Sequence, residues 1–318
     1  MYSTVPHCTN YPLHHIYTTF FLKYTIVPHV HNLLPTVPHV RNPSSQLPTV
    51  PHCTHPFFFS ITQCVPPPPL HTAPHHTRSY LLDYDKVDSH NLNRQLLYGA
   101  QHVHQQKVGS AMETLEHHRV RGKDTELVAM DMNALSSWSE IVKASADCNV
   151  VFDMIDVGEY WDLAVQSLCL ARKCHYVSGG TFQSTVTVDY CPHRAQAPCW
   201  GCCADGFDES VAQQLDPSRI LGYESIDFIP RNVNPIGASN AMVASLCANL
   251  MVNAWVQDLM TQQAPKDFQA QVGPVPNRFI FYMSTFESVK WPIEQSPNCP
   301  LVCSLHLPST TTTVLPAE

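Results

Sequence analysis

Two apolar runs in this chain each end at an aspartate, and this pattern limits the possible fold more than any other feature. The first run covers residues 80–82 and stops at Asp83, and the second covers residues 149–155 and stops at Asp156. Near-continuous apolar runs are typical of interior strands in a parallel sheet. Open α/β sheets bind their ligands at the carboxyl ends of such strands. The pattern therefore predicts an α/β fold with a ligand site at these two strand ends.

A polar segment follows the first aspartate and carries residue types that bind nucleotides. An acid that closes a strand in a nucleotide-binding α/β unit commonly binds the ribose hydroxyls. Arg94 and Lys107 come next along the chain, and such cations are natural partners of phosphate oxygens. An Asp-x-Asp sequence at a strand end also initiates turns, so a structural role for Asp83 is the alternative.

The whole run over residues 83–107 resembles the signature of the E1-like superfamily of ThiF and MoeB type. The family pattern is D-x-D-x-V-x-x-S-N-L-N-R-Q followed by a lysine, and it lies over this stretch without a gap. The sequence D-Y-D-K-V is most similar to activating enzymes of the UFM type. His90 and His104 stand where the family usually has Ser and Gly. The resemblance implies a Rossmann-like adenylation fold with a structural zinc site, and ATP-dependent adenylation of the C-terminal glycine of a ubiquitin-fold protein.

The resemblance also implies roles for individual residues. Asp83 would hold the ribose of ATP, while Asn91, Arg94 and Lys107 would hold the triphosphate. Attack of the modifier's carboxylate on the α-phosphate would need no protein nucleophile. Arg94 and Lys107 would stabilise the pyrophosphate leaving group, and Mg²⁺ would neutralise charge.

Asp156 takes the place of the acid in the family's T-D-N turn, which assists Mg-ATP. Val157 replaces the usual Asn of that turn. Together with Arg94, Asp156 is the expected catalytic residue. It could also cap the helix predicted over residues 159–172, and the two roles are compatible.

The glycine-rich turn of this family has no counterpart in the sequence. That turn, G-x-G-G-x-G, lets the backbone approach the phosphates and aims a helix N-terminus at them. No glycine precedes Gly99, so the fold is expected to be truncated at its N-terminal βα unit. Either an exon is missing from the sequence or the protein has lost the loop.

Residues 1–78 predict a disordered Pro/His-rich extension. The tripeptide V-P-H recurs along it, and acids and glycines are absent. Proline at this density breaks helices and interior strands, and nothing periodic predicts a packed core. Metal binding by the pairs His14-His15 and His75-His76 is an alternative. Translated non-coding sequence at a wrongly predicted gene start is another.

Alternating strands and helices then predict one E1-like domain over residues 79–304, followed by a disordered tail over residues 305–318. Asn234 and Pro235 are good N-cap and N1 residues for the longest helix. Strands are expected over residues 126–132, 149–155 and 277–284, and helices over residues 134–146, 159–172 and 234–260. The resemblance implies that residues 175–180 form the family's next strand and its S-G turn, and that residues 181–189 form a strand of the crossover sheet.

Four of the 13 cysteines form two close pairs, Cys199-x-x-Cys202 and Cys299-x-x-x-Cys303. Two such pairs can close a tetrahedral zinc site, and the structural zinc of the family is held by this arrangement. Cys203 could compete with Cys202 for the metal, and buried free cysteines are the alternative. No clear signal peptide is present, so cysteines as metal ligands or core residues indicate a reducing cytoplasm.

Charge and hydropathy limit the partners. The net charge of −8 argues against nucleic acid, and the apolar run over residues 16–27 is too short to span a membrane. The resemblance implies a ubiquitin-like modifier protein as partner, with a downstream conjugating enzyme and a homodimer as further expectations. Relatives that pass the modifier on have a catalytic cysteine before the long helix. Residues 224–230 contain none, so the sequence does not support a thioester step.

Two other functions compete with adenylation. A non-catalytic E1-like protein that binds a ubiquitin-like partner as a scaffold is favoured by the missing glycine turn and the missing cysteine. A NAD-dependent oxidoreductase on a similar sheet is disfavoured by the absence of G-x-G-x-x-G and by the cysteine pairs.

Overall fold

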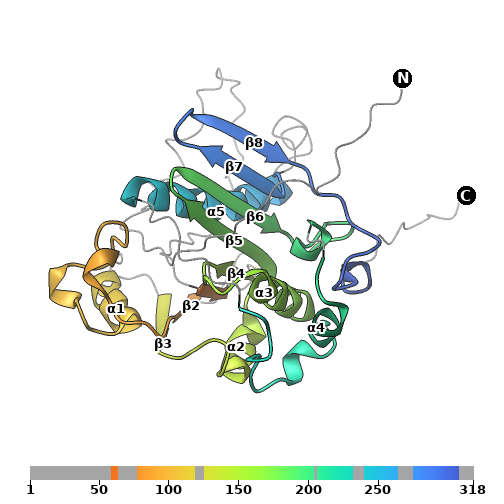
Figure 1. The fold of residues 1–318 in the computed structure, drawn as a ribbon, viewed down its shortest axis with the longest axis horizontal. Coiled ribbons are helices and arrows are strands. Elements are labelled where there is room, and N and C mark those ends of the chain that lie inside the picture. The colour runs from red at the N-terminus through yellow and green to blue at the C-terminus, as the bar shows by residue number, and fades with distance from the viewer. Residues whose placement is uncertain are drawn as a thin grey trace, which may run out of the picture.

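The computed structural model of the protein describes residues 59–63, 77–118, 125–203, 206–231, 240–263 and 275–307. These residues form one eight-stranded sheet with the strand order β3-β2-β1-β4-β5-β6-β7-β8, and helices cover it (Figure 1). The strands are β1 (Phe59–Gln63), β2 (Thr77–Leu82), β3 (Thr125–Met130), β4 (Val150–Asp153), β5 (His175–Phe182), β6 (Thr185–Cys191), β7 (Arg278–Tyr282) and β8 (Glu287–Trp291). The α-helices are α1 (Lys107–His118), α2 (Trp138–Ala144), α3 (Glu159–Arg172), α4 (Glu209–Gln214) and α5 (Ala241–Gln263).

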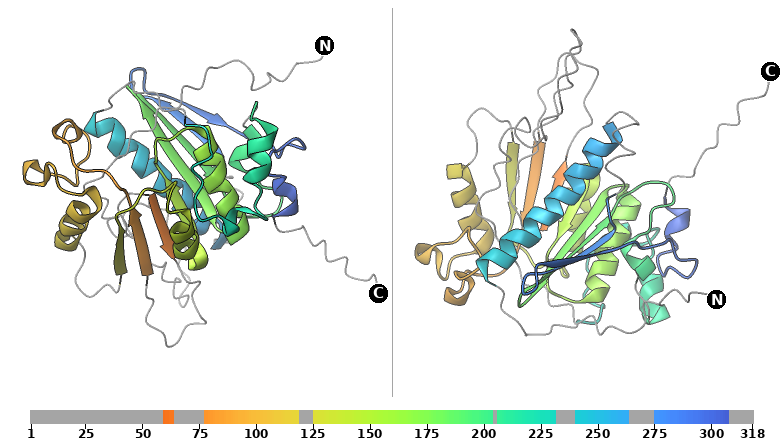
Figure 2. Two further views of the ribbon diagram at one scale, coloured as in Figure 1. Left: turned by 60° about the horizontal axis from the view of Figure 1, so that its bottom comes forward. Right: turned by 90° about the horizontal axis from the view of Figure 1, so that it is seen from above.

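The sheet is covered on both faces near its centre. Strand β4 is buried throughout, and its side chains alternate between the two faces because successive residues of a strand point in opposite directions. Val150 and Phe152 belong to the apolar cluster of α5, whereas Val151 belongs to the cluster of α2 and α3. Figure 2 shows α5 crossing one face while α2 and α3 lie on the other.

Strand β1 runs against its neighbours. It lies between β2 and β4 and pairs antiparallel with both. Phe59 at its start is opposite Leu82, so the chain after Gln63 leaves at the edge away from Asp83. The sequence predicts no strand in residues 1–78, but β1 and the first two residues of β2, Thr77 and Arg78, lie within that extension. The rest of the extension up to residue 76 lies outside the described residues.

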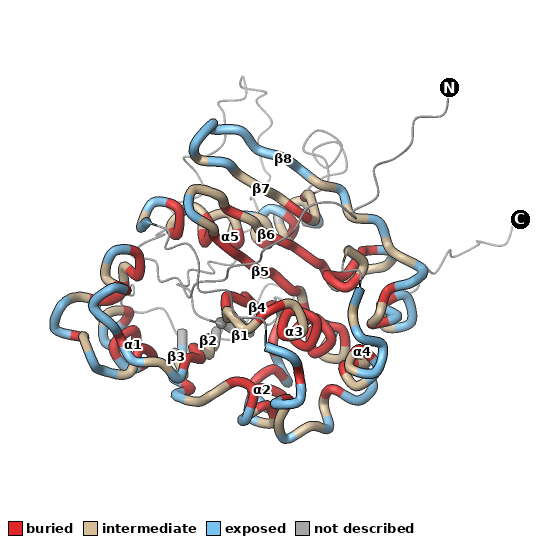
Figure 3. Tube along the Cα trace, viewed as in Figure 1, coloured by how far each residue is buried: buried red, intermediate tan, exposed pale blue. Residues whose placement is uncertain are grey.

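The antiparallel part of the sheet ends in the hairpin of β7 and β8. Arg278 on β7 makes two hydrogen bonds to the buried carboxylate of Asp189 on β6, at 2.6 and 3.0 Å. Such bidentate pairs fix geometry as well as adding energy. Beyond this pair, β8 is almost wholly exposed, and Figure 3 shows the hairpin projecting from the buried centre.

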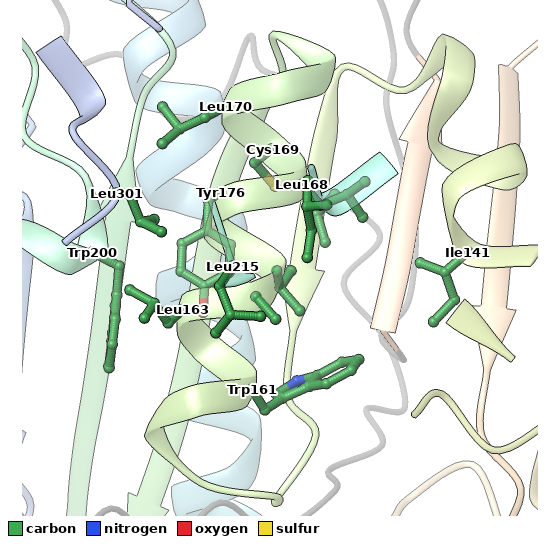
Figure 4. Packing of buried hydrophobic residues seen from close by; sticks show 14 of the residues in the cluster. Ile141, Trp161, Leu163, Leu168, Cys169, Leu170, Tyr176, Trp200, Leu215 and Leu301 are labelled. Atoms are coloured by element: carbon green, nitrogen blue, oxygen red, sulfur yellow. The ribbon is translucent and has the colours of Figure 1, made fainter. Parts of the chain in front are cut away.

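The largest apolar cluster lies between α3, the sheet and the C-terminal segment. The rings of Trp138 and Trp161 meet edge to face at 5.9 Å, and both side chains are fully buried. Leu301 packs into the same cluster as Trp200 and Tyr176 (Figure 4). The C-terminal segment is thus part of the core, although it is far from α3 in the chain.

Most of the predicted elements are present, with shifted ends. The helix predicted over residues 159–172 has the same first and last residues as α3. The helix predicted over residues 134–146 begins only at Trp138, because Asn133 Oδ1 accepts the Leu135 N–H at 2.9 Å and forms a turn first. The predicted cap at Asn234 and Pro235, and the tail after residue 307, lie outside the described residues. Helices α1 and α4 and strand β8 were not predicted.

Among the residues that the structure describes, no helix is both long and apolar enough to cross a membrane.

Candidate functional site

One cavity brings together all five residues predicted to bind the nucleotide. Its volume is about 330 Å³, at the lower end of the range of about 300–1,000 Å³ that is common for small-molecule sites. It lies where β2, β3 and β4 end, and the predicted residues on its wall are Asp83, Asn91, Arg94, Lys107 and Asp156. The cavity thus occupies the edge of the sheet where open α/β sheets bind ligands.

Lys107, the first residue of α1, is buried in a cluster with two carboxylates. Its Nζ lies 2.8 Å from Asp85 Oδ2 and 3.7 Å from Asp83 Oδ2. The Asp85 N–H also donates to Asp83 Oδ1 at 2.9 Å, which fixes the turn after β2. Burial raises the pKa of Asp83 to about 6, although the nearby ammonium of Lys107 opposes this shift. Lys107 therefore faces the cavity with its charge already offset by acids.

Arg94 differs from Lys107 because no described carboxylate pairs with it. Its Nη1 donates to the His90 carbonyl and to Asn93 Oδ1, both at 2.9 Å. Its Nε is buried without a hydrogen-bond partner, and the residue is only 6 % exposed. Desolvation lowers the pKa of Arg94, but a guanidinium remains charged in proteins. A buried cation with an unused donor suits an anionic ligand.

Asn91 has one of its two polar groups committed to the local fold. Its Oδ1 accepts the Asp88 N–H at 2.9 Å, which closes the 3₁₀ turn Ser89–Asn91. This leaves the amide nitrogen as the group of Asn91 that could donate to a phosphate.

Asp153 stabilises the turn that carries Asp156 by accepting hydrogen bonds. Asp153 Oδ1 accepts the Ile155 N–H at 3.2 Å and the Trp161 Nε1–H at 2.8 Å. Gly158, with φ at 116°, is the N-cap of α3 and makes no side-chain cap bond; this φ favours glycine. Asp156 is therefore not the N-cap residue of this helix.

Asp153 shares the hydroxyl of Tyr176 with a second buried acid, Asp162. The hydroxyl oxygen lies 3.2 Å from Asp153 Oδ2 and 3.0 Å from Asp162 Oδ1. Because the hydroxyl carries one hydrogen, it donates to one carboxyl group, and the other must donate to it. Burial raises the pKa of Asp162 well above its usual range and that of Asp153 to about 6. We assign the extra proton to Asp162, since Asp153 accepts two further hydrogen bonds.

Residues that the sequence did not single out also line the cavity. Asn133 follows β3 and Arg231 follows α4. The N–H of Ile226 donates to the Leu135 carbonyl at 2.8 Å, which brings the segment before Arg231 to the cavity wall. No local motif marks Arg231, because its position depends on this long-range contact.

The two cysteine pairs converge against the apolar cluster that α3 shares with the C-terminal segment. The sulfur atoms of Cys199, Cys202, Cys299 and Cys303 all lie within 4.8 Å of one another. Three of the separations are 3.8 Å (Cys199 to Cys202), 3.4 Å (Cys199 to Cys299) and 3.4 Å (Cys202 to Cys303). A Zn–S bond of about 2.3 Å places tetrahedral sulfur ligands roughly 3.8 Å apart. Four thiols at this spacing fit the donor set of a structural zinc.

Hydrogen bonds and close packing surround the four cysteines. Hydrogen bonds from the other three thiols lower the pKa of Cys202, whereas burial raises the pKa of Cys199. Cys203 is not one of the four clustered thiols, and its sulfur donates to the Trp200 carbonyl at 3.0 Å. A Cβ at Gly201 would lie 3.3 Å from Leu163 Cδ1 and 3.4 Å from Cys299 Sγ, so this loop packs closely between α3 and the second pair.

The solved structures that match this chain have low sequence identity to it. Escherichia coli MccB with ATP matches with a TM-score of 0.45 and 15% identity, covering 69% of this chain and 57% of MccB. The MccB structure with succinimide gives a TM-score of 0.46 and 16% identity, covering 70% of this chain and 58% of that one. PaaA gives 0.43 and 19% identity, with coverages of 67% and 63%.

Sequence comparison identifies the family. Molybdopterin-synthase adenylyltransferase of Escherichia coli K12 is 29% identical over 135 residues, which are 41% of this chain and 50% of that protein. The chain thus matches half the length of this relative. The model of the ThiF family matches residues 80–301, well over half of the chain. The resemblance to ThiF- and MoeB-type proteins is confirmed, and the chain belongs to the ThiF family.

Proposed function

We propose that the cavity binds ATP with Mg²⁺ and that the protein adenylates the C-terminal carboxylate of a protein partner. The buried guanidinium of Arg94 carries this proposal, because Arg94 lines the cavity at the strand ends and its Nε has no hydrogen-bond partner. An anion in the cavity would compensate the positive charge of Arg94, which has no carboxylate partner among the described residues. Membership of the ThiF family supports ATP as the source of that anion.

The proposed reaction is a single displacement at phosphorus. A carboxylate oxygen of the partner attacks the α-phosphorus of ATP, the bond from that phosphorus to the bridging oxygen breaks, and pyrophosphate leaves. Asp83 would accept hydrogen bonds from the ribose hydroxyls, while Asn91, Arg94 and Lys107 would hold phosphate oxygens. Mg²⁺, held by Asp156, would neutralise charge on the triphosphate.

We further propose a ubiquitin-like modifier protein as the partner. The Escherichia coli relative is named as an adenylyltransferase of a protein, molybdopterin synthase, which supports a polypeptide substrate. The homodimer, the downstream conjugating enzyme and the cytoplasmic location stay predictions of the family resemblance. The family match leaves the oxidoreductase alternative without support.

One observation favours the scaffold function as a second candidate. Strand β1 runs antiparallel to β2, so the chain leaves it at the edge away from Asp83. No glycine is among the described residues that line the cavity. Because no glycine-rich turn is among the described residues, we expect the triphosphate to be held less firmly and turnover to be slow.

The four clustered cysteines are proposed to hold a structural zinc. Such a centre would join the loop after β6 to the C-terminal segment, whose Leu301 is fully buried in the main core. Its role would be to fix this part of the core, because four cysteine ligands leave no open coordination position for chemistry.

Substitution of Arg94 tests the nucleotide site. Arg94→Ala removes the buried donor, and we expect it to weaken ATP binding at least tenfold in calorimetry, since hydrogen bonds to charged groups contribute about 1.5–3 kcal/mol. Arg219→Ala, an exposed arginine outside the cavity, is the matched control and should bind normally. Absence of ATP binding by the unsubstituted chain would refute the proposal.

ATP–pyrophosphate exchange separates an enzyme from a scaffold. Loss of one well-placed oxyanion donor lowers a rate by about 10²–10³, so exchange dependent on a modifier protein should be at least that much slower than in a ThiF protein with the glycine turn. Slow exchange that Asp156→Ala abolishes supports adenylation. ATP binding without any exchange, across candidate modifiers, leaves the scaffold function, and rapid exchange contradicts the importance of the missing turn.

The pH dependence of ATP binding should follow Asp83. Below about pH 6 its carboxylate is protonated and accepts the ribose hydroxyls poorly, so affinity should fall by up to about tenfold per pH unit. The raised pKa also means that this group's contribution to folding stability falls as pH rises from about 4 to 6. Asp83→Asn should lack the fall in ATP affinity below about pH 6. Dividing the affinity of the unsubstituted chain by that of Asp83→Asn cancels the effect of the titration of ATP itself. A constant ratio from pH 5 to 8 would contradict the role.

Elemental analysis tests the zinc centre. We expect about one zinc per chain, and its loss in Cys202→Ser should cause a large drop in thermal stability, because such sites contribute on the order of 10 kcal/mol to folding. Cys203→Ser is the adjacent control and should keep the metal, since its sulfur bonds the Trp200 carbonyl. Folded protein without zinc would disprove the centre.

A further inference from the structure

Arg231 is a third cation on the wall of the nucleotide cavity, and the roles proposed above do not use it. It lines the same cavity as Arg94 and Lys107. Those two residues follow β2, whereas Arg231 comes from the segment after α4, which Ile226 ties to the Leu135 carbonyl. Arg231 therefore reaches the cavity from a different part of the chain.

The three cations differ in how far carboxylates already neutralise them. Lys107 is buried against Asp85 at 2.8 Å, and Arg94 has no carboxylate partner among the described residues. The ion pair recorded for Arg231 is one contact of 3.3 Å from Nη2 to Asp227 Oδ1. Both side chains of that pair are about half exposed, at 53 % and 46 %. Exposed i,i+4 pairs of this kind are weak, so Arg231 can exchange Asp227 for another anion.

We infer that Arg231 is a further substrate-binding residue, which donates to a phosphate oxygen of the bound nucleotide. This inference rests on the proposed ATP site. A triphosphate is a polyanion, and Arg94 supplies a guanidinium without a carboxylate partner from only one part of the cavity wall. A second guanidinium from another part of the chain supplies planar donors that suit phosphate geometry. It also compensates in part for the backbone donors that no glycine turn provides.

A plainer explanation is that Arg231 serves only as the surface partner of Asp227. The two explanations differ in the effect of Asp227→Asn. If the pair is merely structural, Asp227→Asn and Arg231→Ala should have the same effect. If Arg231 binds phosphate, Asp227→Asn releases it and should leave ATP affinity unchanged or tighter, whereas Arg231→Ala should weaken it.

The test is calorimetric titration of the full chain with ATP and with adenosine, which has no phosphate. We expect Arg231→Ala to weaken ATP binding about tenfold, to leave adenosine binding unchanged, and to be partly rescued by Arg231→Lys. Arg219→Ala, an exposed arginine of the same segment that does not line the cavity, should behave as the unsubstituted chain. Thermal melting of each variant reports whether the fold is retained.

Two results would overturn the inference alone. One is unchanged ATP affinity in Arg231→Ala while Arg94→Ala loses binding, and the other is an equal loss in Asp227→Asn and Arg231→Ala. An equal loss of ATP and adenosine affinity would also count against a phosphate contact. Failure of the unsubstituted chain to bind ATP would overturn the proposed function and this inference together.

Discussion

The common direction of β2, β3 and β4 is the constraint on which the site depends. β2 pairs parallel with β3, and β1 runs antiparallel to both β2 and β4, so β2 and β4 also point the same way. Carboxyl ends of strands that point the same way share one edge of a sheet. Asp83 directly follows β2 and Asp156 lies in the turn after β4, so both line one cavity although they are far apart in the sequence. The zinc-type cysteine cluster lies at a different place, against the core of α3.

The charges at this edge are balanced unevenly. Two acids already offset Lys107, whereas Arg94 is buried without a carboxylate among the described residues. Leaving a charge buried and unpaired costs free energy, and an anion that enters the cavity recovers part of it. The same desolvation raises the pKa of Asp83. Arg94 can therefore bind an anion directly, whereas Lys107 must exchange its acidic partner for a phosphate before it can contribute to binding.

Local patterns in the sequence predicted much of this arrangement. The apolar runs that end at Asp83 and Asp156 located the strand ends, and the spacing of the cysteine pairs predicted their cluster, because both patterns depend on residues close in the chain. The sequence analysis missed β1, although Phe59, Ile61 and Thr62 favour strands, because the segment lies in a proline-rich extension and its pairing with β2 and β4 is long-range. It also missed Arg231, which reaches the cavity through a contact between Ile226 and Leu135. The pairing of Lys107 with Asp85 depends on side-chain geometry that spacing does not fix.

Photolabelling with 8-azido-ATP, followed by peptide mapping, can test whether ATP occupies the cavity at the ends of β2, β3 and β4. We expect label in the cavity-lining peptides around residues 82–107, 133–135 or 154–157, and we expect excess ATP to prevent it. Label confined to other surfaces, such as the exposed hairpin of β7 and β8, or label that ATP does not displace, would show that ATP does not bind in this cavity.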